Sequence, residues 1–211
     1  MAVVDLNSKR NAPTSKLLRK VLRLLRFVLV LPVMRLWRQG LWPTLIWAFV
    51  RGRLFLLGMD TLRYARVTST LYVGGQIRRR GWAALRQVGV TAVVNMRSEH
   101  DDRAAGVPIP EDSYLHLPTV DDTPVSLDDL RRGADWIAAR IAAGGAVYVH
   151  CAAGSGRAPS MGAAYLIAHQ GMTADEALAT IRRARPFIMP LPKQLARLRE
   201  FEALIRNGQP E

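Results

Sequence analysis

The expected fold follows from residues 146–160, which read Ala146-Val-Tyr-Val-His150-Cys151-Ala152-Ala153-Gly154-Ser155-Gly156-Arg157-Ala158-Pro159-Ser160. The segment begins as a short apolar run, typical of a central strand that is buried on both faces of a sheet. Two closely spaced glycines then permit a tight loop, and a helical stretch follows. This strand, loop and helix predict a layered α/β domain.

The loop between Cys151 and Arg157 has the composition of a phosphate-binding loop. Backbone amides of a tight loop can converge on phosphate oxygens, and the N-terminus of the following helix adds partial positive charge. Arg157 offers a bidentate fork, and the same positive field favours a thiolate nucleophile at Cys151. We therefore predict that Cys151 is catalytic and that the phosphate is bound by Ala152, Ala153, Gly154, Ser155, Gly156 and Arg157.

Alternating strands and helices surround this segment. The patterning predicts strands at residues 71–73, 90–95, 114–117 and 146–150. It predicts helices at residues 78–88, 127–143, 159–170, 173–185 and 192–206, with Ser126 and Thr173 as N-caps. The expected fold class is α/β, with a mostly parallel central sheet flanked by helices.

The loop resembles the His-Cys-x-x-Gly-x-x-Arg signature of the protein tyrosine and dual-specificity phosphatases, and the resemblance extends over residues 70–205. Within that superfamily the chain is most similar to the mitochondrial-type phosphatases that act on phosphatidylglycerophosphate. The similar segments are Pro118-Thr-Val-Asp121, Val147-Tyr-Val-His150-Cys151, Gly162-Ala-Ala-Tyr165-Leu-Ile and Pro192-Lys-Gln-Leu195. The resemblance implies hydrolysis of phosphate monoesters through a phosphocysteine, with no metal and no cofactor.

The resemblance also implies a general acid, an Asp about 30 residues before the cysteine. Asp121 and Asp122 lie 30 and 29 residues upstream of Cys151, and Asp121 is preferred because it matches the Val-Asp of the similar segment. His150 is expected to hold the loop and tune the thiol through hydrogen bonds. Asp101 and Asp102 lie in a loop that could border the pocket and are expected to be solvated.

Two positions depart from the family pattern. Ala158 stands where the family usually has Ser or Thr, whose hydroxyl helps the thiolate to leave, and Ser155 or Ser160 are the possible substitutes. Ala152 stands where lipid-directed members often have Lys. The remaining histidines, His100, His116 and His169, show no metal-ligand spacing.

The charge of the chain is concentrated in its first third. The 211 residues carry 30 Lys+Arg and 17 Asp+Glu, a net charge of +13, and residues 1–66 hold 13 basic residues against 2 acidic ones. We therefore divide the chain into a basic, apolar N-terminal extension, residues 1–66, and a catalytic domain, residues 67–211. The single cysteine excludes an intramolecular disulfide and a cysteine-based metal cluster.

The N-terminal extension has features of an interfacial membrane segment. Basic residues recur every three or four positions over residues 16–26, and Trp37, Trp42 and Trp47 follow. Its uncharged runs are too short for a simple membrane span. We expect a helical segment that associates with an anionic membrane on its cytoplasmic face. A helical cap on the soluble domain is the alternative, and no nucleic-acid partner is expected.

The sequence is compatible with three functions. The first is a phosphatase that acts on a phospholipid headgroup such as phosphatidylglycerophosphate. The second is a protein tyrosine or dual-specificity phosphatase. The third, suggested by Ala158, is a phosphate-binding module with little turnover. Because arginine far outnumbers lysine, we also expect a GC-rich, bacterial source.

Overall fold

The structure is a computed structural model. It describes residues 64–208 and ten positions before them: Val33, Leu36, Trp37, Gly40, Leu41, Trp42, Thr44, Leu45, Ala48 and Phe49. The chain divides into two compact units, Met1–Ala48 and Phe49–Glu211. The second unit holds the α/β domain.

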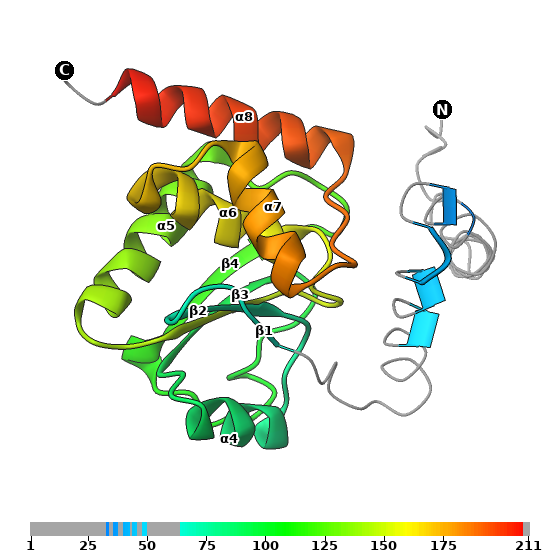
Figure 1. Cartoon of the computed structure of the whole chain (residues 1–211). Helices are drawn as coiled ribbons and strands as arrows, with labels where there is room; N and C mark the ends of the chain where they lie inside the picture. Colours follow the sequence, from blue (N-terminus) through cyan, green and yellow to red (C-terminus); the bar gives the residue numbers. More distant parts are fainter. Residues whose placement is uncertain are drawn as a thin grey trace, which may run out of the picture. The chain divides into compact units, whose positions relative to one another are not determined.

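A five-stranded sheet forms the centre of the α/β domain (Figure 1). In spatial order its strands are β1 (Ala65–Arg66), β2 (Leu71–Gly74), β5 (Val147–His150), β3 (Ala92–Arg97) and β4 (Tyr114–Thr119). Only β1 is antiparallel to its neighbour, and the other strands are parallel. The carboxyl ends of β2, β3, β4 and β5 therefore meet at one edge of the sheet.

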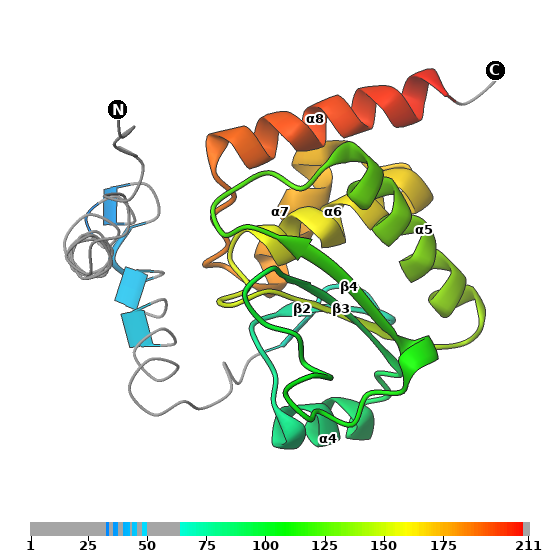
Figure 2. The ribbon, with the colours of Figure 1, turned by 180° about the vertical axis from the view of Figure 1, so that it is seen from behind.

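Helices cover both faces of the sheet, as the views in Figures 1 and 2 show. One face carries α4 (Arg79–Gln87). The other face carries α5 (Leu127–Ala142), α6 (Arg157–Gln170), α7 (Ala174–Ala184) and α8 (Pro192–Asn207). A short 3-10 helix, η2 (Glu111–Ser113), precedes β4.

Strand β5 shows why the sheet needs helices on both faces. Val147 and Val149 join the core beneath α5–α8, whereas Tyr148 joins the core beneath α4. Successive side chains of a strand point to opposite faces, so both faces of this apolar strand are buried. The central position of β5 fixes the place of the loop that follows it.

The expected fold class is confirmed. All four predicted strands and all five predicted helices are present, and the Ser126 and Thr173 side chains accept hydrogen bonds from the first turns of α5 and α7. Helix α6 begins at Arg157, two residues before the predicted start, because Gly156 acts as its N-cap. Strand β1 was not predicted, since two residues are too short to show a periodic pattern.

Some described positions between Val33 and Phe49 are helical, and several large apolar side chains there are exposed. Trp37 is 93% exposed and Trp42 is 72% exposed. The predicted amphipathic segment at residues 16–26 and Trp47 lie outside the described residues. Among the described positions, none belongs to a helix that is both long and apolar enough to cross a bilayer.

Candidate active site

The predicted phosphate-binding loop lies at the carboxyl edge of the sheet, between β5 and α6. Three other segments reach the same edge: the turn after β2, the loop after β3 and the loop after β4. This edge is where open parallel sheets bind their ligands. The sheet topology therefore brings together residues that are far apart in the sequence.

The five peptide carbonyls between Cys151 and Arg157 all accept hydrogen bonds from donors around the loop. The amide of Gln76 donates to Ala152 O (3.1 Å), and the amide of Met189 donates to Ser155 O (2.7 Å). Arg185 donates to the carbonyls of Ala153 (2.9 Å) and Gly154 (2.7 Å), and Ser160 donates to that of Gly156 (3.0 Å). These contacts hold the carbonyls away from the centre of the loop.

The amides of the loop face the opposite way. The amide of Gly154 donates to Cys151 Sγ at 3.3 Å. Within the described part of the chain, the other amides of the loop have no acceptor: Ala152, Ala153, Ser155 and Gly156. Amides that converge on one point and lack acceptors form an anion-binding concavity.

Gly154 is the residue that allows this loop to close. Its φ of +66° lies in the left-handed region, where side chains are disfavoured. A Cβ there would also collide with the Gly74 carbonyl and lie 2.7 Å from the Arg185 guanidinium. The loop therefore requires glycine at this position.

Arg157 is fixed in place by contacts on three sides. Its guanidinium binds both carboxylate oxygens of Glu99, at 2.9 and 3.1 Å, and donates to the carbonyl of Thr119 at 2.8 Å. Its side chain is only 1% exposed. Arg157 Nε is buried and has no hydrogen-bond partner among the described residues. That N–H is therefore available to an oxyanion above the loop.

Glu99 is a site residue that the sequence analysis did not identify. Burial by itself raises the pKa of its carboxyl, but hydrogen bonds from Arg157 and Arg97 outweigh burial and lower the pKa to about 2. Glu99 is therefore ionised at neutral pH and serves as the counter-ion of Arg157. Its position directly after β3, at the carboxyl edge of the sheet, is the sequence feature that could have identified it as a site residue.

The structure brings Asp121 to the site. Its carboxylate lies 2.9 Å from Arg157 Nη2, and its side chain is 56% exposed. The adjacent Asp122 is also exposed and has a left-handed φ of +61°. Both residues follow the end of β4. Asp121 forms an ion pair with Arg157.

Two buried polar side chains that sequence analysis missed support the loop from α7 and α8. Arg185, one residue after α7, binds two loop carbonyls and stacks on Phe187 at 4.3 Å. Burial lowers the pKa of this guanidinium. Gln194 donates to Thr123 O at 3.0 Å, in the loop that carries Asp121. A Cβ on Gly156 would lie 2.9 Å from Gln194 Oε1, so Gln194 also packs on the loop.

The expectation that Asp102 is solvated was wrong. Asp102 and His150 are both fully buried, with Oδ2 of Asp102 2.6 Å from Nε2 of His150. The segment after β3 folds back against β5, which places this carboxylate behind the loop. Asp101 is partly exposed and accepts bonds from the amides of Arg103 and Ala104.

Of the two candidate hydroxyl groups near Cys151, that of Ser160 makes another hydrogen bond. Ala158 is fully buried and supplies no hydroxyl. The Ser160 hydroxyl donates to the carbonyl of Gly156 at 3.0 Å, and Ser155 is half-buried. Over the described residues, there is no group of three or more His, Cys, Asp or Glu side chains that could hold a metal ion.

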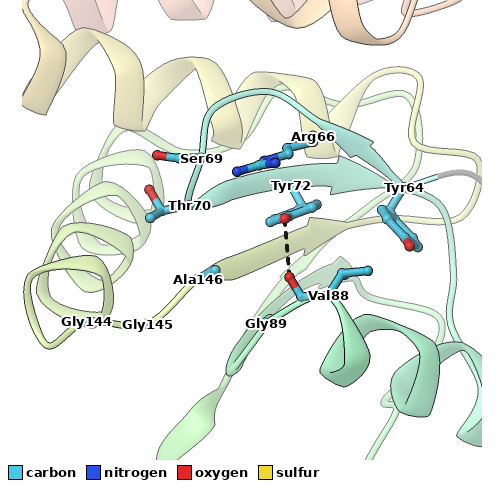
Figure 3. Close-up of a pocket in the computed structure, with 10 residues that line it drawn as sticks. All are labelled: Tyr64, Arg66, Ser69, Thr70, Tyr72, Val88, Gly89, Gly144, Gly145 and Ala146. Carbon is cyan, nitrogen blue, oxygen red and sulfur yellow. Dashed lines mark hydrogen bonds between the residues drawn. The ribbon is translucent and has the colours of Figure 1, made fainter.

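A separate pocket lies at the opposite end of the sheet (Figure 3). It has a volume of about 440 Å³ and is lined by residues that precede β2, β3 and β5, among them Thr70, Gly89 and Ala146. Figure 3 shows Tyr64, Arg66 and Tyr72 around it. Because Cys151 follows the other end of β5, this pocket is separate from the phosphate-binding loop.

Comparisons with known proteins identify the family of this chain. Residues 71–204 match the family of the dual specificity phosphatase catalytic domain. The phosphatidylglycerophosphatase and protein-tyrosine phosphatase 1 of Rattus norvegicus is 33% identical over 174 residues, which cover 76% of this chain and 86% of the rat protein. The dual specificity phosphatase 28 of Homo sapiens is 30% identical over 143 residues, which cover 67% of this chain and 78% of the human protein.

Solved structures share the fold as well. The crystal structure of PTPMT1 in complex with PI(5)P superposes with a TM-score of 0.61 and 30% sequence identity, covering 68% of this chain and 97% of that one. The chain therefore belongs to the dual specificity phosphatase family. It is a phosphoric monoester hydrolase of the cysteine-dependent type.

Arg185→Lys is expected to lower kcat/KM for an aryl phosphate by about 10- to 100-fold, because a lysine cannot bind both carbonyls with a planar fork. The decrease in the thermal midpoint of unfolding should be too small to explain this loss of activity. Arg182→Lys, on the exposed side of α7, is the matched control and should behave like wild type. Wild-type activity in a folded Arg185→Lys variant would contradict this role.

Glu99→Gln is expected to reduce stability at pH 7 and to reduce it less in acid. The lowered pKa means that wild-type Glu99 contributes fully above about pH 4.5 and loses its contribution as the pH falls toward about 2. Urea unfolding of both proteins at pH 7 and pH 3.5 would measure the difference. Glu111→Gln, which removes an exposed carboxylate, is the control; a pH-independent difference for Glu99→Gln would contradict the assignment.

Proposed function

We propose that the protein removes the terminal phosphate from a phospholipid headgroup, with phosphatidylglycerophosphate as the first substrate to test. The observation that carries the catalytic part is the loop itself. Donors around the loop bind its carbonyls, the amide of Gly154 donates to Cys151 Sγ, and the amides of Ala152, Ala153, Ser155 and Gly156 have no acceptor among the described residues. The lipid part draws on the rat relative, which is named as a phosphatidylglycerophosphatase.

In the proposed first step, Cys151 Sγ attacks phosphorus and forms a sulfur–phosphorus bond while the bond to the leaving oxygen breaks. The loop amides and Arg157 bind the equatorial oxygens, whose charge they stabilise in the transition state. Asp121 gives its proton to the leaving alkoxide. In the second step water attacks phosphorus, Asp121 takes a proton from that water, and the thiolate leaves with release of inorganic phosphate.

The ion pair between Asp121 and Arg157 suggests how the acid becomes available. In the structure, the Asp121 carboxylate lies 2.9 Å from Nη2 of Arg157. A phosphate dianion in the loop competes for that same N–H. We infer that substrate displaces Asp121 from Arg157. The unpaired carboxylate then takes up a proton from solvent and, as the neutral acid, faces the leaving group. Its exposed position in the loop after β4 is compatible with such a change.

Two properties of the N-terminal extension support a membrane-bound substrate. Residues 1–66 hold 13 basic and 2 acidic residues, and each basic residue near an anionic leaflet contributes roughly 1 kcal/mol to binding. The described helical positions there also expose Trp37, Leu41 and Trp42. We propose that this segment holds the enzyme on an anionic membrane at its cytoplasmic face. The bacterial source stays a prediction.

A phosphoprotein substrate is the second possibility. The rat relative is also named as a protein-tyrosine phosphatase, and the human relative is a dual specificity phosphatase. Purified protein should therefore be assayed with phosphatidylglycerophosphate, a phosphoinositide and a phosphotyrosine peptide. We expect the highest kcat/KM with phosphatidylglycerophosphate in mixed vesicles. A higher value for the peptide would overturn the lipid assignment and leave the phosphatase mechanism intact.

Asp121→Asn is expected to slow turnover of an alkyl phosphate by about 10² to 10⁴, the usual range for loss of a general acid. The loss should be much smaller for an aryl phosphate, whose leaving group needs less protonation. Asp122→Asn is the matched control, since it removes the adjacent carboxylate. If Asp122→Asn shows this leaving-group dependence and Asp121→Asn does not, the acid is Asp122.

Removal of the N-terminal extension is expected to abolish membrane binding and to leave the phosphatase activity intact. The predicted boundary at Arg66 coincides with the end of β1, so a chain that keeps the whole sheet begins at Tyr64. This shorter chain should melt cooperatively and cleave aryl phosphates like the full chain, because the proposed catalytic residues all lie beyond Tyr64. Co-sedimentation with anionic vesicles at low salt should be lost, and equal binding by both chains would contradict membrane anchoring.

A further inference from the structure

Gln194 is a buried side chain of α8 that contacts two loops of the site. Its side chain amide makes two hydrogen bonds: Oε1 accepts from the amide of Leu191 at 2.9 Å, and Nε2 donates to the carbonyl of Thr123 at 3.0 Å. The residue is 3% exposed. Because its acceptor and its donor each have a matching partner, the carboxamide is held in one orientation. The bond to Thr123 joins residues that are 71 positions apart in the chain.

The turn that carries Asp121 is bound to the rest of the domain on both sides. The carbonyl of Thr119, two residues before Asp121, accepts a hydrogen bond from Arg157 at 2.8 Å. The carbonyl of Thr123, two residues after Asp121, accepts the hydrogen bond from Gln194. These two anchors connect the turn to residues that also contact the phosphate-binding loop.

Between the two anchors the chain forms a compact turn. The amide and the hydroxyl of Thr123 both donate to the carbonyl of Val120, at 3.2 and 2.8 Å. Val120 is 61% exposed and the side chain of Asp121 is 56% exposed, so packing of these side chains contributes little to the position of the turn. Because hydrogen bonds inside the turn fix its shape, a bond to Thr123 also helps to fix where Asp121 lies.

The other side of the Gln194 carboxamide lies against the phosphate-binding loop. A Cβ on Gly156 would lie 2.9 Å from Oε1 and 3.3 Å from Nε2 of Gln194. Glycine at this position therefore leaves room for the close approach of the carboxamide. Gln194 thus rests on the loop that surrounds Cys151 while it binds the turn that carries Asp121.

We propose that Gln194 is a positioning residue that sets the place of the Asp121 carboxyl relative to a phosphate in the loop. The inference rests on the proposed role of Asp121 as general acid. When substrate displaces Asp121 from Arg157, the turn loses one contact and keeps its bond to Gln194. A proton donor acts only within hydrogen-bond reach of the leaving oxygen, so loss of this bond lowers activity without altering the nucleophile.

Gln194→Met tests this role, because methionine has a similar length and has no amide donor or acceptor. We expect kcat/KM for an alkyl phosphate to fall by about 10- to 100-fold, and kcat/KM for an aryl phosphate, whose leaving group needs less protonation, to fall by about 3-fold or less. Gln170→Met, the same substitution at an exposed glutamine of α6, is the matched control and should behave like wild type. Equal losses for the two substrates would overturn the proposal.

A double-variant cycle shows whether the effect passes through Asp121. In an Asp121→Asn background, Gln194→Met should add no leaving-group dependence, because the proton donor is already absent. Added dependence in that background would overturn the proposal. If Asp121→Asn alone shows no leaving-group dependence, the proposed acid is wrong and this inference fails with it. If Asp121→Asn shows the dependence and Gln194→Met does not, only this inference fails.

Gln194→Glu provides a second variant in case Gln194→Met does not fold. Glutamate keeps the acceptor for the amide of Leu191 and places a carboxylate oxygen where the donor to Thr123 was, so the bond to the turn is the one that is lost. We expect the same leaving-group dependence from this variant. Wild-type kinetics of a folded Gln194→Glu variant with both substrates would overturn the proposal.

Discussion

The orientation of the five peptide groups between Cys151 and Arg157 is the constraint on which the site depends. Each carbonyl is bound by a donor around the loop, including the guanidinium of Arg185 and the amides of Gln76 and Met189. Since a peptide group has its N–H opposite its carbonyl, anchoring the carbonyls aims the amides at the space above Cys151. These contacts fix the proposed anion site through the fold itself, which is the condition for electrostatic preorganisation.

The rest of the fold supplies those anchors and the charges around them. Strand β3 leads to Glu99, which fixes Arg157, and strand β4 leads to Asp121. Gln194 on α8 contacts both the phosphate-binding loop and the loop that carries Asp121. Parallel strands with a common carboxyl edge allow these distant segments to meet. The same supports explain why buried polar residues, which are costly in a core, are tolerated around this loop.

The strand, loop and helix around Cys151 could be predicted from sequence because the evidence is local: an apolar run, two glycines and a helix start. Asp121 could be predicted from the family resemblance and its spacing. Glu99, Asp102 and Arg185 could not, since their partners lie 58, 48 and 31 residues away. Asp102 reads as a loop carboxylate in sequence, and only the packing of its loop against β5 reveals that it is buried. The proposed membrane association involves residues 1–66, where most positions lie outside the described residues.

The proposed mechanism depends on a phosphocysteine intermediate at Cys151, and this intermediate can be trapped. The enzyme would be quenched in acid during turnover of an aryl phosphate, digested, and analysed by mass spectrometry. We expect a phosphoryl group on the peptide that contains Cys151 and none on the corresponding peptide of Cys151→Ser. Turnover by Cys151→Ser at a rate close to wild type, or a phosphoryl group on another residue, would contradict it.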